Sequence, residues 1–187
     1  MAEIRALVFD KAGPQNTQAT LELAGRRSDE LGIDEIVVAT STGKTALEAA
    51  RAMPGKRVIG VTLQAGLFDK YVGPDPDIVG PAEELGVQFV TCPHALMGSL
   101  DSAVKDKFGG LPPGEFISYV YYTFCQGMKV AVEVAMMAAD AGRLSMDGDI
   151  IAIAGTENGA DTAIVLTPAY TNEFFDLRVR EILAKPR

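Results

Sequence analysis

The amino-acid sequence predicts an α/β fold with three layers, α/β/α, built on a mostly parallel sheet with an antiparallel edge strand. Short β-rich apolar runs alternate along the chain with segments of helical periodicity, which is typical of parallel strands joined by helices. Late in the chain, the apolar runs 150–154 and 162–166 are separated by one short loop. Strands joined in this way pair antiparallel, and we expect the second of them at the sheet edge.

The first half of the chain predicts three strands and two helices. The strands are the apolar runs 4–9, 34–39 and 57–62. Apolar residues at helical spacing predict a first helix with Asn16 or Thr17 as its N-cap and Gly32 at its end. Residues 46–53 predict a second helix, which Pro54-Gly55 closes.

The second half predicts two helices and three strands. We expect a short helix over 81–85, before Gly86, and a long Ala-, Met- and Val-rich helix over 114–141, which ends at Gly142. The predicted strands are 87–91, 150–154 and 162–166. Gly- and Pro-rich segments at 73–81 and 108–114 are expected to be loops, and Asp75 and Asp77 in the first of them a solvated turn.

Length and composition predict one domain over 1–187. With 48% hydrophobic and 22% charged residues, the chain has enough apolar material for a core, which excludes intrinsic disorder and small disulfide scaffolds. The only cysteines are Cys92 and Cys125, and no signal-peptide pattern precedes them. We therefore expect a reduced, cytoplasmic protein.

Charge and hydropathy exclude two classes of partner. Seventeen Lys and Arg against 25 Asp and Glu give a formal charge of -8, which repels nucleic acid and anionic membranes, so a positive site has to be local. The longest apolar stretch, 116–128, is shorter than the roughly 18 residues that a membrane-spanning helix needs. We expect no nucleic-acid or membrane partner.

A hydroxyl-rich loop follows the strand 34–39 and leads into a helix; its residues are Thr40, Ser41, Thr42, Gly43, Lys44 and Thr45. Such a loop offers unpaired backbone N–H groups, hydroxyl donors, the positive end of a helix dipole and one cation, which together suit a phosphate. It is not a nucleotide-binding P-loop, because that motif requires a glycine five positions before Gly43, where this chain has Val38. A well-capped helix start without a ligand is the alternative.

A second polar loop follows the apolar strand 150–154, and its candidate binding residues are Gly155, Thr156, Gly159, Ala160, Asp161 and Thr162. Ligands of open α/β sheets lie beyond the carboxyl ends of the parallel strands, so we expect the two loops to meet at one sheet edge. The alternative is a plain hairpin turn at Asn158-Gly159.

Together the two loops carry a resemblance. The segment 36–62 and the loop from Gly155 resemble the C-terminal domain of pyruvate kinase, whose corresponding loops hold a phosphorylated effector. Nearly the full chain resembles the stand-alone family of pyruvate kinase C-terminal domain-like proteins, through segments at 16–17, 39–46, 94–96, 107–110, 126–130, 137–142, 159–163 and 172–176. This resemblance implies that fold without the catalytic barrel, no pyruvate kinase activity, and a pocket suited to flavin mononucleotide (FMN).

Histidine chemistry is limited in this chain. Where the resemblance leads us to expect histidines, after the strand 57–62, the sequence has Leu63-Gln64, which leaves His94 as the only histidine. Cys92 and His94 are two candidate metal ligands where three or four are usual, so we expect no metal. His94 is expected to be a structural hydrogen-bonding residue, with an acid–base role as the alternative.

Two apolar segments have alternative interpretations. We expect the Met-rich segment 128–141 to pack in the core, with cofactor contact as the alternative. The aromatic residues Tyr119, Tyr121, Tyr122 and Phe124 are expected in the core, with stacking on a planar ring as the alternative. Either segment could leave an apolar face for a homo-oligomer.

The function expected from the sequence is binding of a phosphorylated small molecule, FMN first and a sugar phosphate second, between the two loops. In this hypothesis Lys44 and the loop hydroxyls hold the phosphate, Gly155 and Gly159 allow close backbone approach, and Asp161 orients a hydroxyl or ring nitrogen. The competing hypotheses are an enzyme that uses flavin redox chemistry or a phosphorylated metabolite, and a sugar-phosphate-sensing regulatory protein. One histidine provides no Ser-His-Asp or Cys-His set.

Overall fold

The protein, described from a computed structural model over residues 5–187, contains one seven-stranded sheet in the order β1-β7-β6-β5-β2-β3-β4. The strands are β1 (Leu7–Phe9), β2 (Glu35–Ala39), β3 (Arg57–Val61), β4 (Gln88–Val90), β5 (Ile150–Ala154), β6 (Thr162–Thr167) and β7 (Arg178–Pro186). Four neighbouring pairs are parallel, and β6 runs antiparallel to both β5 and β7. The predicted α/β class with a mostly parallel sheet is confirmed.

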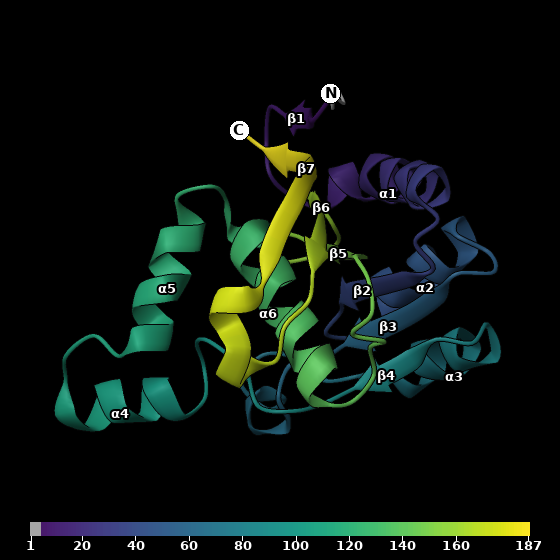
Figure 1. Cartoon of the computed structure of the whole chain (residues 1–187). Coiled ribbons are helices and arrows are strands. Elements are labelled where there is room, and N and C mark those ends of the chain that lie inside the picture. Colours follow the sequence, from purple (N-terminus) through teal and green to yellow (C-terminus); the bar gives the residue numbers. More distant parts are fainter. Residues whose placement is uncertain (1–4) are drawn as a thin grey trace.

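The helices lie on both faces of the sheet (Figure 1). The α-helices are α1 (Thr17–Leu31), α2 (Lys44–Ala52), α3 (Pro76–Glu84), α4 (Leu100–Phe108), α5 (Pro113–Tyr122) and α6 (Gln126–Asp140). Three 3-10 turns, η1 (Pro14–Asn16), η2 (Ala65–Leu67) and η3 (Thr171–Asp176), complete the described elements. No helix in this part of the chain is long and apolar enough to cross a membrane.

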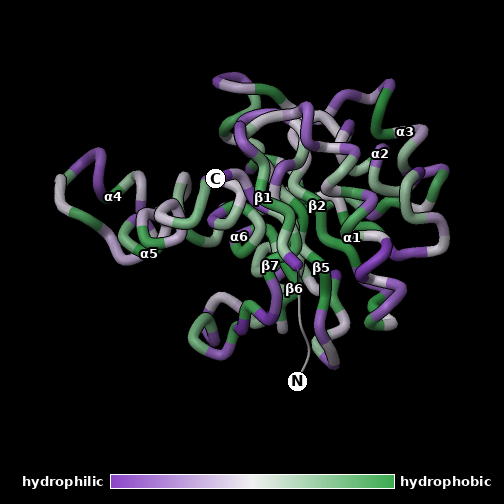
Figure 2. The backbone as a smooth tube through the Cα atoms, turned by 90° about the horizontal axis from the view of Figure 1, so that it is seen from above, coloured by the Kyte–Doolittle hydropathy of each residue, from purple (hydrophilic) through white to green (hydrophobic). Residues whose placement is uncertain are grey.

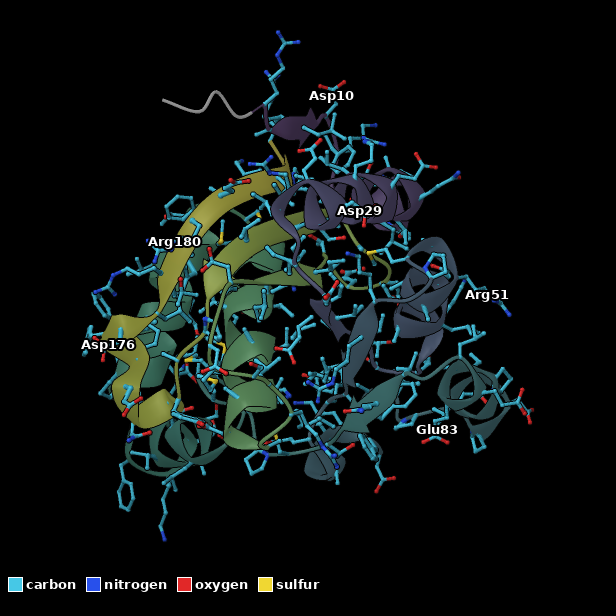
Figure 3. The ribbon with its side chains drawn as sticks, turned by 45° about the vertical axis from the view of Figure 1, so that its right-hand side comes forward. Asp10, Asp29, Arg51, Glu83, Asp176 and Arg180 are labelled. Carbon is cyan, nitrogen blue, oxygen red and sulfur yellow. The ribbon has the colours of Figure 1, made fainter. Side chains whose placement is uncertain are left out.

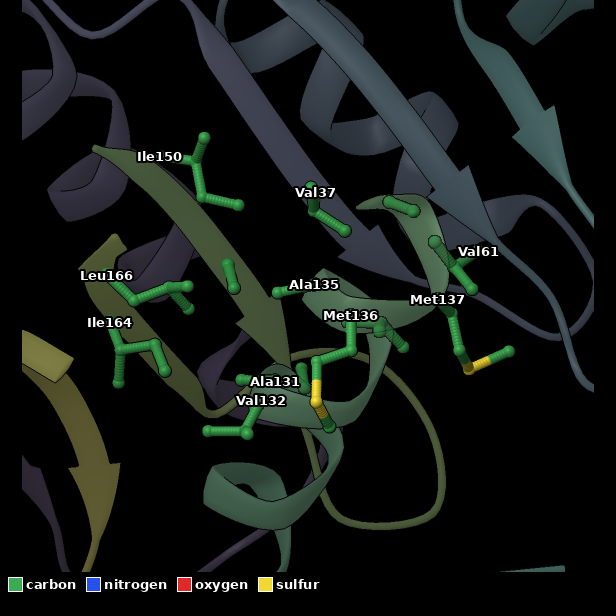
Figure 4. Packing of buried hydrophobic residues seen from close by; sticks show 14 of the residues in the cluster. Val37, Val61, Ala131, Val132, Ala135, Met136, Met137, Ile150, Ile164 and Leu166 are labelled. Atoms are coloured by element: carbon green, nitrogen blue, oxygen red, sulfur yellow. The ribbon is translucent and has the colours of Figure 1, made fainter. Parts of the chain in front are cut away.

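Alternation along the strands divides the core into two. On β2, Val37 faces the cluster formed with α6, whereas Ile36 and Val38 face the cluster formed with α1, α2 and α3. Figure 4 shows the α6 side, where Met136 and Met137 pack against residues of the strands. The result is the predicted three-layer α/β/α arrangement, with charged side chains of both signs around its periphery (Figure 3).

The sheet margin differs from the expectation. The predicted antiparallel pairing of 150–154 with 162–166 is confirmed, but β6 lies two strands in from the margin, because β7 pairs along its outer side. The edge strand on this side of the sheet is β1, which pairs parallel with β7, and the opposite edge strand is β4. Of the predicted strand 4–9, residues 7–9 form β1, and Ile4 lies outside the described residues.

Three helix predictions need correction. The segment 114–141 is two helices, α5 and α6, because Cys125 is extended (φ 177°, ψ 168°) and caps α6 with its side chain. The third helix begins at Pro76, earlier than residue 81, because the Asp75 carboxylate accepts the Asp77 N–H at 3.0 Å and caps it. The sequence analysis did not identify α4.

Candidate functional site

A cavity of about 1550 Å³ lies at the carboxyl ends of β2, β3 and β5. The first residues after these strands, Thr40, Thr62 and Gly155, all line it. This is the edge at which open α/β sheets bind ligands. The cavity borders residues of both helical layers, from α1 and α2 on one side and from α6 on the other.

The two predicted loops meet at this cavity. Seven of the predicted site residues line it: Thr40, Ser41, Thr42, Lys44, Thr45, Gly155 and Gly159. The other five are not among its described lining residues: Gly43, Thr156, Ala160, Asp161 and Thr162. In the second set, Gly43 has a positive φ, Ala160, Asp161 and Thr162 are buried, and Thr156 is half-buried.

The first loop presents donors at the start of α2. Gly43 has φ 100° and its N–H donates to Thr40 Oγ1 at 3.1 Å, which folds the loop back toward the strand. The N-cap residue of α2 is Gly43, which has no side chain to cap the helix; the Lys44 N–H donates to Thr42 Oγ1 at 3.4 Å, and the next backbone N–H groups of the first turn remain available. The Ser41 hydroxyl makes no hydrogen bond to any described residue and lines the cavity. The Lys44 side chain is 71% exposed, with Glu48 4.0 Å away.

The second loop is held by its own carboxylate. Asp161 is fully buried, and its Oδ2 accepts the N–H groups of Gly13 at 3.0 Å and Thr156 at 3.2 Å. Its Oδ1 accepts the Thr162 hydroxyl at 2.8 Å. Asp161 was expected to orient a ligand; here its oxygens bind the loop and the segment before α1. Its geometry is that of a positioning residue.

Close packing explains the glycines of the second loop. A Cβ on Gly155 would lie 2.6 Å from the Gly159 carbonyl oxygen. Gly159 has φ 70°, and a Cβ there would lie 2.9 Å from Pro14 Cα. The neighbouring Ala160 N–H donates to Thr17 Oγ1 at 2.9 Å. The loop therefore packs directly on the start of α1, and Pro14 and Thr17 also line the cavity.

Three helices begin at the cavity. Its lining includes Thr17 from the first turn of α1, Lys44 from α2 and Gln126 from α6. Each helix N-terminus carries roughly half a positive charge from its aligned peptide dipoles. These helix ends supply positive partial charge in a chain of net charge -8, and the formal charges of the lining are Lys44, Arg51 and Lys129 against Glu22, Glu48, Glu133 and Glu157.

The sequence analysis missed a buried ion pair on α6. Lys129 is 5% exposed and Glu133 is 3% exposed, and both line the cavity. Lys129 Nζ donates to Glu133 Oε2, while Glu133 Oε1 accepts the N–H groups of Leu96 at 2.9 Å and Met97 at 3.0 Å. The ammonium has three donors and one protein acceptor among the described residues, which leaves capacity for a ligand. The i, i+4 spacing of Lys and Glu in an apolar helix was the available signal.

His94 is a structural residue in this fold. Its Nδ1 lies 3.0 Å from the Met97 carbonyl oxygen, and its Nε2 accepts the Gln64 N–H at 3.3 Å. The assignment that satisfies both contacts puts the proton on Nδ1. Burial raises the pKa of the Cys92 thiol, with a smaller effect of the Asp140 charge. Over residues 5–187, no group of three or more His, Cys, Asp or Glu side chains could hold a metal ion.

The aromatic segment divides between the cavity and the surface. Tyr122 lines the cavity, and burial raises its pKa, so that its hydroxyl stays protonated. Tyr119 packs on Tyr122 edge-on, with ring centroids 6.0 Å apart, and is itself 49% exposed. Tyr121 packs against the α6 core cluster, whereas Phe124 is 48% exposed. The expected core role holds for only part of this segment.

Comparison with known proteins gives a family match and a structural similarity. A family model described as "Pyruvate kinase, alpha/beta domain" matches residues 18–166. Among solved structures, a pyruvate kinase from Cryptosporidium parvum is similar over 82% of this chain, with 13% sequence identity and a TM-score of 0.43. The matched region spans 23% of that pyruvate kinase chain.

Proposed function

Because this chain belongs to the pyruvate kinase alpha/beta domain family and its two polar loops line one cavity, we propose that it binds a phosphorylated small molecule there. FMN is the first ligand we propose and a sugar phosphate the second. The observation that carries the proposal is that two chemically different sets of residues line the cavity, the hydroxyl- and N–H-rich loop before α2 on one side and the mainly apolar α6 on the other.

The phosphate is proposed to bind at the start of α2. Ser41 and Thr42 provide hydroxyls, the first turn of α2 provides backbone N–H groups, and Lys44 adds charge at the cavity rim. Hydrogen bonds to a charged group contribute about 1.5–3 kcal/mol each. The Ser41 hydroxyl, with no protein partner in the described chain, is the clearest candidate donor.

The part of the cavity lined by α6 suits a planar ring with a polar edge. Val130, Val134 and Met137 of α6 supply apolar surface, and Tyr122 borders the same space. Lys129 places a cation with free donor capacity within this apolar wall. A flavin ring has this combination of an apolar body and oxygen or nitrogen acceptors at one edge, whereas a sugar phosphate has no part that would use the apolar wall.

The cavity has room for a ligand of the size of FMN. The cavity of about 1550 Å³ exceeds the roughly 300–1,000 Å³ of a typical ligand pocket. When bound, FMN would supply redox chemistry, while Ser41, Thr42 and Lys129 bind and orient it. Both ring nitrogens of His94 make structural hydrogen bonds, so an enzyme acting on a phosphorylated metabolite would need another base, for which the lining offers carboxylates such as Glu157. We place the protein in the cytoplasm, with small molecules rather than nucleic acid or membranes as partners.

The test compares three ligands by isothermal titration calorimetry, after the ultraviolet-visible spectrum of the freshly purified protein has been recorded for bound flavin. We expect FMN to bind more tightly than riboflavin, which lacks the phosphate, and than ribose 5-phosphate, which lacks the ring. No binding of any of the three would overturn the proposal. Binding of ribose 5-phosphate as tight as that of FMN would establish the sugar-phosphate alternative.

Two variants test the loop before α2 and the α6 side of the cavity separately. Ser41→Ala should weaken FMN and ribose 5-phosphate by about tenfold or more and leave riboflavin unchanged. Lys129→Met combined with Glu133→Gln should weaken FMN and riboflavin alike and spare ribose 5-phosphate. The second substitution avoids an unpaired buried carboxylate and keeps an acceptor for Leu96 and Met97. Lys107→Met, far from the cavity lining on α4, is the control.

A further inference from the structure

The helices α4 and α5 form an arm, residues 99–124, that extends away from the sheet (Figures 1 and 2). Within the arm, α4 packs on α5, and α5 packs on α6. None of the residues of α4 is buried, and the buried residues of α5 are Glu115 and Ser118. The most deeply buried side chains of these two helices are therefore polar, while Ile117 and Tyr121 of α5 pack against the α6 core cluster.

A polar network holds the arm in one shape. The Glu115 carboxylate accepts from Lys105 Nζ at 2.7 Å and from the Ser102 hydroxyl at 2.8 Å. The Gly114 N–H donates to Asp101 Oδ2 at 2.6 Å. These bonds join the two helices without using their apolar residues, so the outer surface is preorganised and costs little ordering entropy to bind.

The outer surface carries two apolar stripes at helical spacing. On α4 the stripe is Leu100, Val104 and Phe108, at i, i+4 and i+8. On α5 it is Phe116, Tyr119 and Val120. Leu100 and Phe108 are each 75% exposed and Phe116 is 56% exposed. Two such stripes on adjacent helices are a pattern that normally faces a packing partner.

The exposed area matches one side of a stable dimer. With Leu111 and Phe124, eight large apolar residues of the arm are between 40% and 75% exposed. At roughly 150–250 Å² for an aromatic side chain, they present on the order of 800 Å². A standard interface buries about 800 Å² on each partner. The largest apolar patch of a typical monomer is about 300–600 Å².

Charge favours a second copy of this chain as the partner. The arm has three carboxylates, Asp101, Asp106 and Glu115, and two lysines, Lys105 and Lys107, so its net charge is -1 within a chain of -8. Two arms can therefore meet with little of the repulsion between the acidic bodies. Because Asp101 and Lys105 are bonded within the arm, the remaining charges of α4 are one of each sign, Asp106 and Lys107, and these can pair between two antiparallel copies.

We propose that the arm is a homodimerisation surface, in which two copies pack the α4 and α5 stripes together about a twofold axis. The twofold arrangement brings the same surface from each copy into contact, as isologous dimers require. Val104, in the middle of the α4 stripe, then lies close to its own counterpart.

The test is the molar mass in solution, measured by light scattering during gel filtration over a range of concentrations. We expect a species of twice the 19.8 kDa chain mass. Phe108→Ser combined with Phe116→Ser should convert it to monomer. Phe175→Ser, which removes an 84% exposed phenylalanine on η3 outside the arm, should leave the dimer intact. Circular dichroism verifies that each variant is folded.

A second measurement tests the geometry. Val104→Cys should be cross-linked between copies by a short bis-maleimide, whereas Phe175→Cys should not. A monomer at all concentrations, or a dimer that the arm variants leave unchanged, overturns the proposal. The proposal is also overturned if the protein does not self-associate but sediments with phosphatidylcholine vesicles, and the arm variants lose this binding. The arm would then be a membrane-binding surface.

Discussion

At the scale of single residues, Gly159 packs the second polar loop, residues 155–162, against the start of α1. Its φ of 70° and its approach to Pro14 leave no room for a side chain. Gly159→Ala should lower the free energy of unfolding by about 1–3 kcal/mol, because it adds strain and overpacking. Urea unfolding followed by circular dichroism measures the change.

Gly148→Ala is the matched control for that prediction. Gly148 is also a loop glycine, but its φ is not positive and a Cβ there would meet nothing within 4 Å. The free energy of unfolding of Gly148→Ala should differ from that of the natural protein by less than about 0.5 kcal/mol. Equal effects of the two substitutions would contradict the packing argument.

The sequence was sufficient to place several candidate residues at one cavity, but not to predict the hydrogen-bond partners of each residue. Ser41 and Lys44 could be placed at the cavity because strand, loop and helix follow one another locally. The hydrogen-bond partner of Asp161 could not, because Gly13 lies 148 positions away. The burial of Lys129 was not predicted for a similar reason, since it depends on how α6 packs against distant strands.

At the scale of elements, the break between α5 and α6 could not be predicted from the sequence pattern alone. Residues 114–141 are apolar and contain no proline after the first turn of α5, so periodicity gave no reason to divide them. The division depends on Cys125, whose Sγ accepts the Met128 N–H at 3.3 Å and lies 3.4 Å from Thr162 Oγ1. The sequence did not predict β7, because the first residues of this strand, 178–180, are exposed and two of the three are charged.

The arm is expected to be acid-sensitive through Glu115. Hydrogen bonds from Lys105 and then Ser102 lower the pKa of this carboxyl below its ordinary 4.5. A lowered pKa means that the charged form stabilises the fold, so its contribution is complete above about pH 4.5 and is lost as the pH falls through the lower folded value. The arm should therefore loosen below pH 4.5.

Tyrosine fluorescence measures this loosening, because Tyr119, Tyr121 and Tyr122 all lie on α5. We expect the signal of the natural protein to change as the pH falls below about 4.5, and that of Glu115→Gln to vary much less over the same range. Glu83→Gln, at an exposed position on α3, should behave like the natural protein. An unchanged transition in Glu115→Gln would contradict the assignment.

At the scale of the whole molecule, alternation of strands and helices was sufficient to predict the layers, because each βα unit packs by local rules. The strand order near the margin was not predictable in this way. β1 pairs with β7, from opposite parts of the chain, and nothing in either segment specifies its partner. The same long-range pairing brings the start of α1 to the cavity.

The order of folding follows from these contacts. The Gly13 N–H and the Ala160 N–H each donate to a side chain more than 140 positions away. Contacts between distant residues form late, because closing a long loop costs entropy before any interaction compensates. In pulsed hydrogen exchange during refolding from urea, these two amides should gain protection in the slowest phase, after the amide of Val37 in β2. Simultaneous protection would contradict this order.

The Asp161 contacts therefore make the cavity a product of the completed fold. The strand pairs β2–β3 and β5–β6 can assemble from neighbouring segments, whereas the wall that includes Pro14, Thr17 and Gly159 exists only once both halves of the chain have met. Newly synthesised chains would become competent for a ligand only after β6 has joined the sheet. Binding of the proposed ligand would then be restricted to completely folded molecules and, by mass action, would selectively stabilise them over incomplete ones.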